Sequence, residues 1–404
     1  MLSYTDARQK VIQMAEARRG ELVLETMKLR NALGRVLAED VRADRDYPPF
    51  HRATRDGFAV RSADIAGTST KIRVIGESKA GTPFPGTVGH GQCVQIMTGA
   101  GVPAGADAVV MLEHTRATNG DVVIERNIRA GENIVASGSE AKANQVVLPR
   151  GTRLGYAELA MAAQVGHTDV QVYRRPRVAV LSTGDEVVAI ERPPGPFEIR
   201  NSNGVSLEAQ AQLAGAEPVP LGNAPDRAEE LRALIEKGLK NDILVLSGGV
   251  SAGKYDLVEG ALRDLGAEFF FDAIAIRPGR PAVFCSRGNT LIFGLPGNPV
   301  STMVTFELLV LPAIDIRGGL GPRPLPLFKA KLARPVTQKA VLTHFLPARV
   351  SWPEGEPVVE ELPWQGSGDI IAVAQANCFL VVPETKLSLA VGDWVEVLPR
   401  RGMF

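Results

Sequence analysis

The sequence VAVLSTGDE at residues 178–186 passes directly from apolar residues to small, hydroxyl and acidic ones. The same change occurs in ILVLSGGVSAGKYD at residues 243–256 and in LIFGLPGNPVS at residues 291–301. A short apolar run followed by glycine and polar residues is typical of a strand that is buried on both faces and ends in a turn. These stretches therefore predict strands of one sheet, each followed by a polar loop.

The segments between these strands predict an open α/β domain. We expect strands at 178–181, 218–221, 243–246 and 291–293, and helices at 202–214, 226–240, 257–265 and 300–311. Strands that alternate with helices form a mostly parallel sheet covered on both faces, and its ligands bind at the carboxyl ends of the strands. We therefore expect a ligand site at that edge of the sheet.

The rest of the chain predicts further domains. We expect a mixed α/β linker domain at 1–46 and 141–175, a β-rich insert domain at 47–140, the α/β domain at 176–323 and a C-terminal β domain at 324–404. Outside the α/β domain, helices are expected at 4–17, 26–33 and 156–165, and strands at 72–75, 93–97, 108–111, 122–124, 379–382 and 394–398. The expected fold class is multidomain α/β plus β, with a central open, mostly parallel sheet.

Composition limits the partners of this protein. Its 404 residues include 45 basic and 45 acidic side chains, so there is no overall field for nucleic acid or a membrane. The three cysteines lie far apart, without disulfide or zinc-site spacing. The amino terminus lacks the apolar segment of a signal peptide, and no stretch approaches about 18 consecutive apolar residues. We expect a soluble, cytoplasmic protein.

The loops after the expected strands favour an anionic ligand. Their glycines allow backbone N–H groups to approach an anion, and the hydroxyls of Ser247, Ser251 and Ser301 can add hydrogen bonds. Helices that start after these loops direct their positive dipole ends to the same place. Arg277 and Arg280 add guanidinium groups suited to oxyanions. Each loop alone is more often an ordinary turn, but their occurrence on successive strand ends favours a binding site.

Carboxylates accompany these donors at the same edge. They are Asp185, Glu186, Asp226 and Asp256. Because carboxylates repel a bare phosphate, and because Mg²⁺ binds oxygen ligands from carboxylates and phosphates together, we infer a Mg²⁺-bridged phosphate or pyrophosphate. The chain contains no GxSxG, HExxH or GxxxxGK[ST] motif, which argues against the corresponding hydrolases, zinc proteases and P-loop proteins.

Two further motifs complete a family resemblance. RATRDGFAV at residues 52–60 and IMTGAGVPAGADAVV at residues 96–110, together with the three loops, resemble the molybdopterin molybdenumtransferase family in order along nearly the whole chain. That family includes the bacterial molybdenum insertases and the E domain of gephyrin. The resemblance implies an elongated homodimer of four-domain subunits, with the site between the α/β domain of one subunit and the insert of the other.

The resemblance also implies a reaction and its residues. The expected activity is insertion of molybdate into adenylylated molybdopterin with Mg²⁺-dependent release of AMP, and a molybdopterin adenylyltransferase and molybdoenzyme maturation factors are expected as partners. Asp56, Glu186, Asp226 and Asp256 are the expected catalytic residues, and the last three are also the expected Mg²⁺ ligands. The residues expected to bind substrate are Thr98, Ser182, Thr183, Gly184, Ser247, Gly248, Gly249, Ser251, Gly253, Lys254, Arg277, Arg280, Pro296, Gly297, Asn298, Pro299, Ser301, Arg349 and Ser367.

The chain departs from the family pattern at several positions. Arg55 stands where methionine is usual, and Arg277 and Arg280 stand where lysines are usual. The segment 131–144, GENIVASGSEAKAN, replaces a usual arginine by valine and changes the acidic pair, and Ile371-Ala372 replace a hydroxyl pair. Two alternatives therefore remain open: a paralogue that binds or delivers the pterin cofactor without turnover, and a phosphoanhydride hydrolase acting on another nucleotide-linked substrate.

Overall fold

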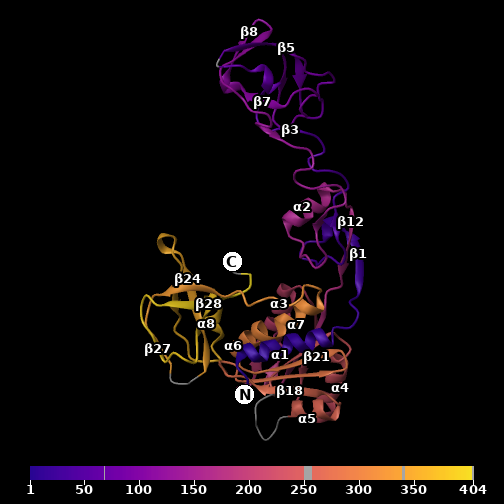
Figure 1. Ribbon diagram of the computed structural model, residues 1–404. Coiled ribbons are helices and arrows are strands. Elements are labelled where there is room, and N and C mark those ends of the chain that lie inside the picture. The colour runs from indigo at the N-terminus through magenta and orange to yellow at the C-terminus, as the bar shows by residue number, and fades with distance from the viewer. Residues whose placement is uncertain (68, 250–256, 339–341, 403–404) are drawn as a thin grey trace.

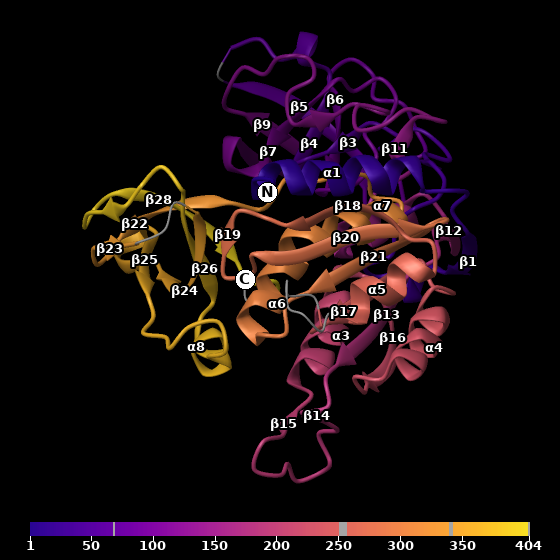
Figure 2. The same ribbon diagram turned by 90° about the horizontal axis from the view of Figure 1, so that it is seen from below.

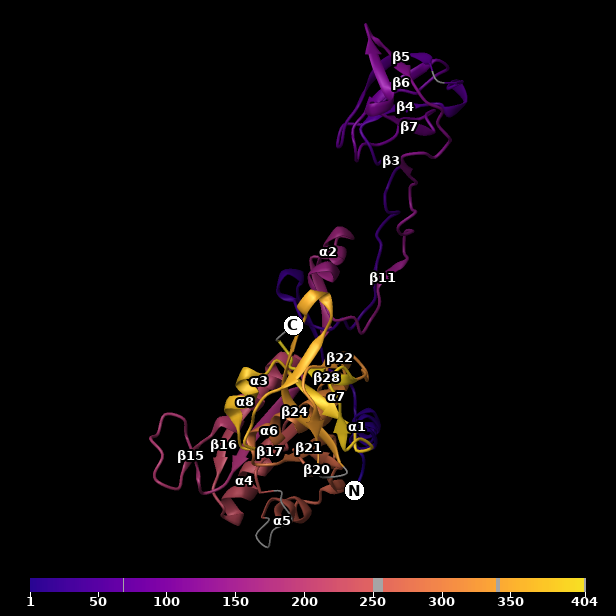
Figure 3. The ribbon, with the colours of Figure 1, turned by 90° about the vertical axis from the view of Figure 1, so that its left-hand side faces the viewer.

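The computed structural model describes residues 1–67, 69–249, 257–338 and 342–402 of an elongated molecule. The insert lies at one end, the α/β and C-terminal domains lie at the other, and a narrow linker region separates them (Figures 1 and 3). This arrangement confirms the expected fold class. It also places the insert far from the α/β sheet of the same chain.

The α/β domain contains an open, mostly parallel sheet. Its strand order is β16 (Glu217–Ala224), β13 (Arg177–Thr183), β17 (Ile243–Ser247), β21 (Thr290–Leu295), β20 (Pro281–Arg287) and β18 (Glu268–Ala273). Strands β16, β13, β17 and β21 are parallel, whereas β20 and β18, which the sequence analysis did not anticipate, extend the sheet in antiparallel fashion. From β13 the chain passes to β16 on one side and then to β17 on the other. The strand order therefore reverses between β13 and β17, where such sheets bind ligands.

Helices cover both faces of this sheet (Figure 2). On one face, Leu207 and Ala211 of α3 (Ser202–Ala214) share a core with residues of the run from Pro299 to Arg317. On the other, α4 (Ala228–Gly238) and α5 (Leu257–Asp264) share a second core. The expected helices of this domain are confirmed, with their bounds shifted by a few residues at most sites.

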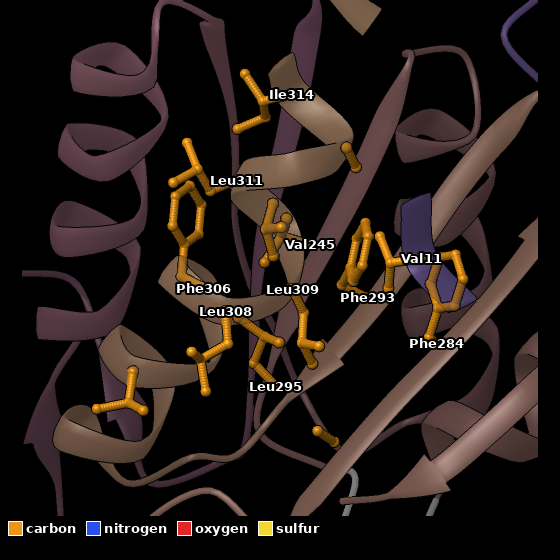
Figure 4. Packing of buried hydrophobic residues seen from close by; sticks show 14 of the residues in the cluster. Val11, Val245, Phe284, Phe293, Leu295, Phe306, Leu308, Leu309, Leu311 and Ile314 are labelled. Carbon is orange, nitrogen blue, oxygen red and sulfur yellow. The ribbon is translucent and has the colours of Figure 1, made fainter. Parts of the chain in front are cut away.

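The helical run on the first face extends beyond its expected end. It comprises α6 (Pro299–Thr305), the π-helical turn η4 (Phe306–Val310) and α7 (Leu311–Arg317). This run is long and apolar enough to cross a membrane, but 89% of it is buried inside the protein. Figure 4 shows Leu309 of this run beside Leu295 of the sheet, whereas Phe306 and Leu311 project from another side of the run. It is therefore a core helix of the α/β domain.

Helix α1 (Tyr4–Ala17) belongs to the same core. Ser3 caps it by accepting a hydrogen bond from the Asp6 backbone N–H, 3.1 Å. Ala7, Val11 and Ala15 are fully buried in the cluster that contains the Phe306–Val310 turn. The first helix thus covers the α/β domain, although the sequence analysis grouped it with the linker.

The linker region corrects one expected element. The helix expected at 26–33 is wrong, because β1 (Leu24–Lys28) pairs with β12 (Asp169–Tyr173) and only a short 3₁₀ turn follows it. Side-chain exposure alternates along β1, as is typical of a strand. Its backbone hydrogen bonds are made with β12, which is distant in the sequence. The expected helix at 156–165 is confirmed as α2 (Tyr156–Gln164). The linker also contains β2 (Val41–Arg42) and β11 (Val146–Leu148), which pair with each other.

The other domains are built from mostly antiparallel sheets. The insert sheet has the order β7 (Ala108–Met111), β4 (Gly57–Val60), β6 (Gln92–Ile96), β5 (Thr70–Ser78), β9 (Asp121–Ile124) and β8 (Thr115–Thr118), with β5 and β6 parallel. At its base β3 (Arg52–Ala53) pairs with β10 (Ile134–Val135). The C-terminal domain closes into a barrel of β24 (Thr343–Ser351), β25 (Val358–Glu361), β22 (Phe328–Leu332), β28 (Trp394–Pro399) and β26 (Cys378–Val382), because β26 pairs with both β28 and β24.

We expect the α/β core to depend on Phe293. Its ring stacks on Phe284 with centroids 4.9 Å apart, and both side chains are fully buried. Phe293→Ala should lower the free energy of unfolding by about 3–5 kcal/mol, because it removes a buried ring and leaves a cavity. Phe197 is 93% exposed and serves as the matched control. Phe197→Ala should change the free energy of unfolding by less than about 0.5 kcal/mol. Equal effects in urea unfolding would contradict this account of the core.

Candidate functional site

Loops from three parallel strands meet at the carboxyl edge of the sheet. We call residues 184–186, 247–249 and 296–299 the rim loops; they follow or complete β13, β17 and β21. The Gly248 N–H donates to the Leu295 carbonyl oxygen, 3.1 Å, and a Cβ built on Gly297 would lie 3.6 Å from the Gly248 Cα. The expected substrate-binding residues Ser182, Thr183 and Ser247 are buried beneath these loops. The loop after β17 therefore contacts the end of β21 and the loop that follows it, and it lies against Thr183 at the end of β13.

Glycine is required where two rim loops touch. Gly248 adopts φ of 94°, a left-handed conformation that side chains disfavour. A Cβ there would lie 2.9 Å from both the carbonyl oxygen and the Oγ1 of Thr183. Gly184 and Gly249 also have positive φ, 127° and 62°. Gly249 is exposed, whereas the N–H groups of Gly184 and Gly248 already donate to the carbonyl oxygens of Ala224 and Leu295.

Acidic side chains lie beside these loops. The Asp226 backbone N–H donates to the Asp185 carboxylate, 3.1 Å, so the ends of β13 and β16 are adjacent. Asp185, Glu186 and Asp226 are all exposed. Asp185 also lines a hollow of about 380 Å³ with Arg192 and Arg227. The structure thus brings Asp226 to the segment that carries Glu186.

The expected metal ligands can be tested in part. Among residues 1–67, 69–249, 257–338 and 342–402, no three His, Cys, Asp or Glu side chains form a preassembled metal cluster. The exposed carboxylates at this edge fit Mg²⁺ bound through one or two protein carboxylates, with phosphate and water as the remaining ligands. Asp256 lies outside the described residues, as do Ser251, Gly253 and Lys254.

The third rim loop contacts the C-terminal domain. The Asn298 side-chain amide donates to Ser367 Oγ, 2.8 Å, and the Val300 N–H donates to the Ser367 carbonyl oxygen, 3.0 Å. Pro296 and Ser301 are buried, whereas Gly297 and Asn298 are exposed. The expected site residue Ser367 therefore reaches this loop from another domain.

The arginines of the expected site divide into two groups. Arg277 ends β19 (Ile276–Arg277), which pairs with β24 of the barrel beside His344. Burial, and then the nearby Arg277 charge, lower the pKa of His344. Arg277 and Arg280 are exposed, whereas Arg349 donates to the Gln375 carbonyl oxygen, 2.9 Å, next to α8 (Ile370–Gln375).

Asp56 and Thr98 lie on the insert, away from the rim loops of the same chain (Figures 1 and 3). The backbone N–H and the hydroxyl of Thr98 donate to one Asp56 carboxylate oxygen, at 2.6 Å and 2.8 Å. These two bonds, the backbone one first, lower the pKa of Asp56. An ionised, oriented carboxylate is therefore presented at the surface of the insert.

The divergent segment 131–144 lies at the base of the insert. Ile134 and Val135 form the strand that pairs with Arg52 and Ala53. The Glu140 carboxylate contacts the Arg52 guanidinium at 3.3 Å. Glu140 is thus engaged with the motif that carries Asp56.

Two asparagines support the rim loops. The side-chain amide of Asn223 donates to the carbonyl oxygens of Gly184 and Val187, at 2.9 Å and 3.0 Å. Asn201 caps α3 by accepting from the Gly204 N–H, 2.8 Å, and also accepts from the Ser182 hydroxyl, 2.8 Å. From the sequence alone, an asparagine at the start of a helix predicts only an ordinary helix cap. The second partner of Asn201, the Ser182 hydroxyl, is brought near only by the tertiary fold.

We expect Gly248→Ala to open the contact between rim loops. Alanine there combines an unfavourable φ with a clash against Thr183. Gly222→Ala is the matched control, because Gly222 has φ of 82° but nothing within 4 Å of its built Cβ. Gly248→Ala should be less stable than the control by about 1–3 kcal/mol in urea unfolding. Equal stability of the two variants would contradict the tight contact.

We expect Thr98→Val to raise the pKa of Asp56 toward its ordinary value, since the variant removes one of two donors. The lowered native pKa stabilises the fold above the unfolded-state pKa, and this contribution is lost as pH falls through the native pKa. Thr115→Val, in the same domain, removes a hydroxyl bonded to Leu112 instead. Carboxyl ¹³C titration should show a raised Asp56 pKa in the first variant alone; an unchanged value in Thr98→Val would refute the assignment.

Comparisons with known proteins agree with the domain order of this chain. Family models match in order: the MoeA N-terminal region (domain I and II) over residues 2–166, a probable molybdopterin binding domain over 179–315 and the MoeA C-terminal region (domain IV) over 329–399. The molybdopterin molybdenumtransferase of Bacillus subtilis (strain 168) is 36% identical, covering 93% of this chain and 89% of the relative. That of Staphylococcus aureus (strain N315) is 32% identical, covering 96% and 94%.

Solved structures agree with these relatives. A molybdopterin biosynthesis MoeA protein from Pyrococcus horikoshii is 33% identical with a TM-score of 0.76, over 97% of this chain and 98% of that one. A second MoeA protein, from Pyrococcus horikoshii OT3, is 26% identical with a TM-score of 0.81, over 99% and 100%. With sequence, domain order and fold matched over nearly its full length, the chain belongs to the molybdopterin molybdenumtransferase family.

Proposed function

We propose that this molybdenum insertase transfers molybdate into adenylylated molybdopterin and releases AMP in a Mg²⁺-dependent step. It acts as a homodimer in the cytoplasm and receives its substrate from a molybdopterin adenylyltransferase. The observation that supports this proposal is the close packing at one edge of the sheet, where glycine backbone and exposed carboxylates lie together. Both substrates are oxyanions, so the same edge suits each of them.

The rim loops supply the donors for phosphoanhydride cleavage. Water forms a new bond to the AMP phosphorus as the bond from that phosphorus to the bridging oxygen breaks. The bridging oxygen leaves on the molybdopterin phosphate, the proton of the water passes to solvent, and negative charge remains on both phosphate products. In this proposal the exposed Gly249 after β17 donates its backbone N–H to these oxygens. Exposed Arg277 and Arg280, next to the barrel junction, add cationic donors for molybdate.

The carboxylates orient the reacting groups. Glu186, Asp226 and Asp256 would hold Mg²⁺, which when bound supplies charge neutralisation for the phosphates. Asp226 is itself held by its backbone N–H bond to Asp185. Maturation factors for molybdoenzymes would then accept the completed cofactor.

A second subunit completes the site in this proposal. Asp56 is ionised and oriented by Thr98, but its domain lies far from the rim loops of its own chain. A homodimer in which each insert faces the partner's rim loops would supply the missing carboxylate. This arrangement gives a physical reason for the elongated subunit.

Glu140 supports a second candidate, a protein that binds or delivers the pterin cofactor without turnover. The Glu140 carboxylate is engaged with Arg52 and so is not free to act as a separate acid on the insert. Such a protein would bind the pterin but release no AMP. The Asp226→Ala variant of such a protein would bind the pterin as well as the wild type does, because the Asp226 carboxylate would have no catalytic role.

The decisive experiment combines the assay with subunit complementation. Wild-type protein with adenylylated molybdopterin, molybdate and Mg²⁺ should release AMP, and Asp56→Ala and Asp226→Ala homodimers should each lose this activity. Mixed dimers isolated with two different affinity tags should retain about half of the wild-type rate, since one of their two sites is complete.

Two outcomes separate the candidates. No AMP release from the wild-type protein, with a relative from Bacillus subtilis active in parallel, would exclude turnover and leave the binding protein. Inactive mixed dimers from inactive parents would instead exclude a site shared between subunits.

A further inference from the structure

The first turn of α3 lies against two of the rim loops. The side-chain amide nitrogen of Asn203 donates to Ser247 Oγ at 2.8 Å and to the Gly297 carbonyl oxygen at 2.7 Å. Ser247 ends β17, whereas Gly297 belongs to the loop that follows β21. One amide group therefore connects two loops that are about 50 residues apart in the chain.

The orientation of this amide is determined by its partners. A carbonyl oxygen accepts hydrogen bonds but cannot donate them, so the amide nitrogen, not the oxygen, must face Gly297. The Asn203 Oδ1 is buried and has no hydrogen-bond partner within the described residues. Leaving a buried polar atom unpaired is unfavourable, which indicates that the two donated bonds outweigh that cost.

Asn203 acts where the loops have little other support. The direct bond between them in the described chain is that from the Gly248 N–H to the Leu295 carbonyl oxygen, 3.1 Å. Gly248 and Gly297 carry no side chains that could hold them together. Asn203 adds a side-chain link between them from the neighbouring helix α3.

We infer that Asn203 is a positioning residue, which holds the loop after β17 and the loop after β21 at a fixed separation for the reaction. This inference rests on the proposed function. If the nucleotide-linked pterin contacts one loop and molybdate the other, a shift between loops alters the alignment of the two substrates. The contacts between each substrate and its own loop would be unchanged. The loss should therefore appear in kcat more than in binding.

Asn203→Ala and Asn203→Asp test this role. Aspartate keeps the shape of asparagine but directs an oxygen, in place of a donor, at the Gly297 carbonyl. Both variants should lower kcat for AMP release about 10- to 100-fold, the scale expected for a displacement of roughly 1 Å between reacting groups. The dissociation constant for AMP should change less than about 3-fold, which corresponds to about 0.6 kcal/mol.

Asn241 provides the matched control. Its amide nitrogen also donates to two carbonyl oxygens, those of Lys237 and Gly238 at 3.3 Å and 3.1 Å, and its Oδ1 is also buried without a partner in the described chain. It lies before β17, at the opposite end of that strand from Ser247. Asn241→Ala should lose similar thermal stability but keep wild-type kcat. Equal kcat in the Asn203 and Asn241 variants would overturn the inference, as would loss of AMP binding in parallel with kcat.

Hydrogen exchange separates this inference from the proposed function. The Gly248 amide should exchange faster in Asn203→Ala than in wild-type protein, and Asn241→Ala should leave it unchanged. If wild-type protein releases no AMP but this exchange pattern holds, the proposed function fails while the link between loops stands. Unchanged exchange at Gly248 in Asn203→Ala would overturn the link whatever the activity.

Discussion

Parallel pairing of β13, β17 and β21 is the constraint on which the candidate site depends. Because these strands run in the same direction, their carboxyl ends lie at one edge, and the polar loops after them must meet there. The contact is close enough to require glycine: Gly248 lies against Thr183, and Gly297 lies near Gly248. This packing leaves Gly249 and the carboxylates of Asp185, Glu186 and Asp226 exposed at the same edge.

The surroundings of this edge come from outside the α/β domain. Helix α1 fills part of the core beneath the sheet, and β19 joins the sheet of the C-terminal barrel beside His344. Ser367 reaches the third rim loop from the same barrel. The barrel therefore acts as a second wall of the candidate site. The insert, by contrast, presents Asp56 far from this edge, which is why a second subunit enters the proposed function.

The divergent positions have specific structural settings. Val135 takes part in the short ladder with Arg52 at the base of the insert, and Glu140 pairs with the Arg52 guanidinium. Arg277 places a cation at the junction of the α/β domain and the barrel.

Sequence by itself determined the α/β domain, because apolar runs followed by glycine-rich loops specify buried parallel strands and anion-binding turns. It identified Glu186, Asp226 and the three loops as members of one edge. It misread residues 26–33 as a helix, since local spacing does not reveal that β1 pairs with β12 about 145 residues later. It also passed over Asn203. Only the tertiary structure decided that role, because a hydrogen bond to Gly297 exists only once separate strands have been brought side by side.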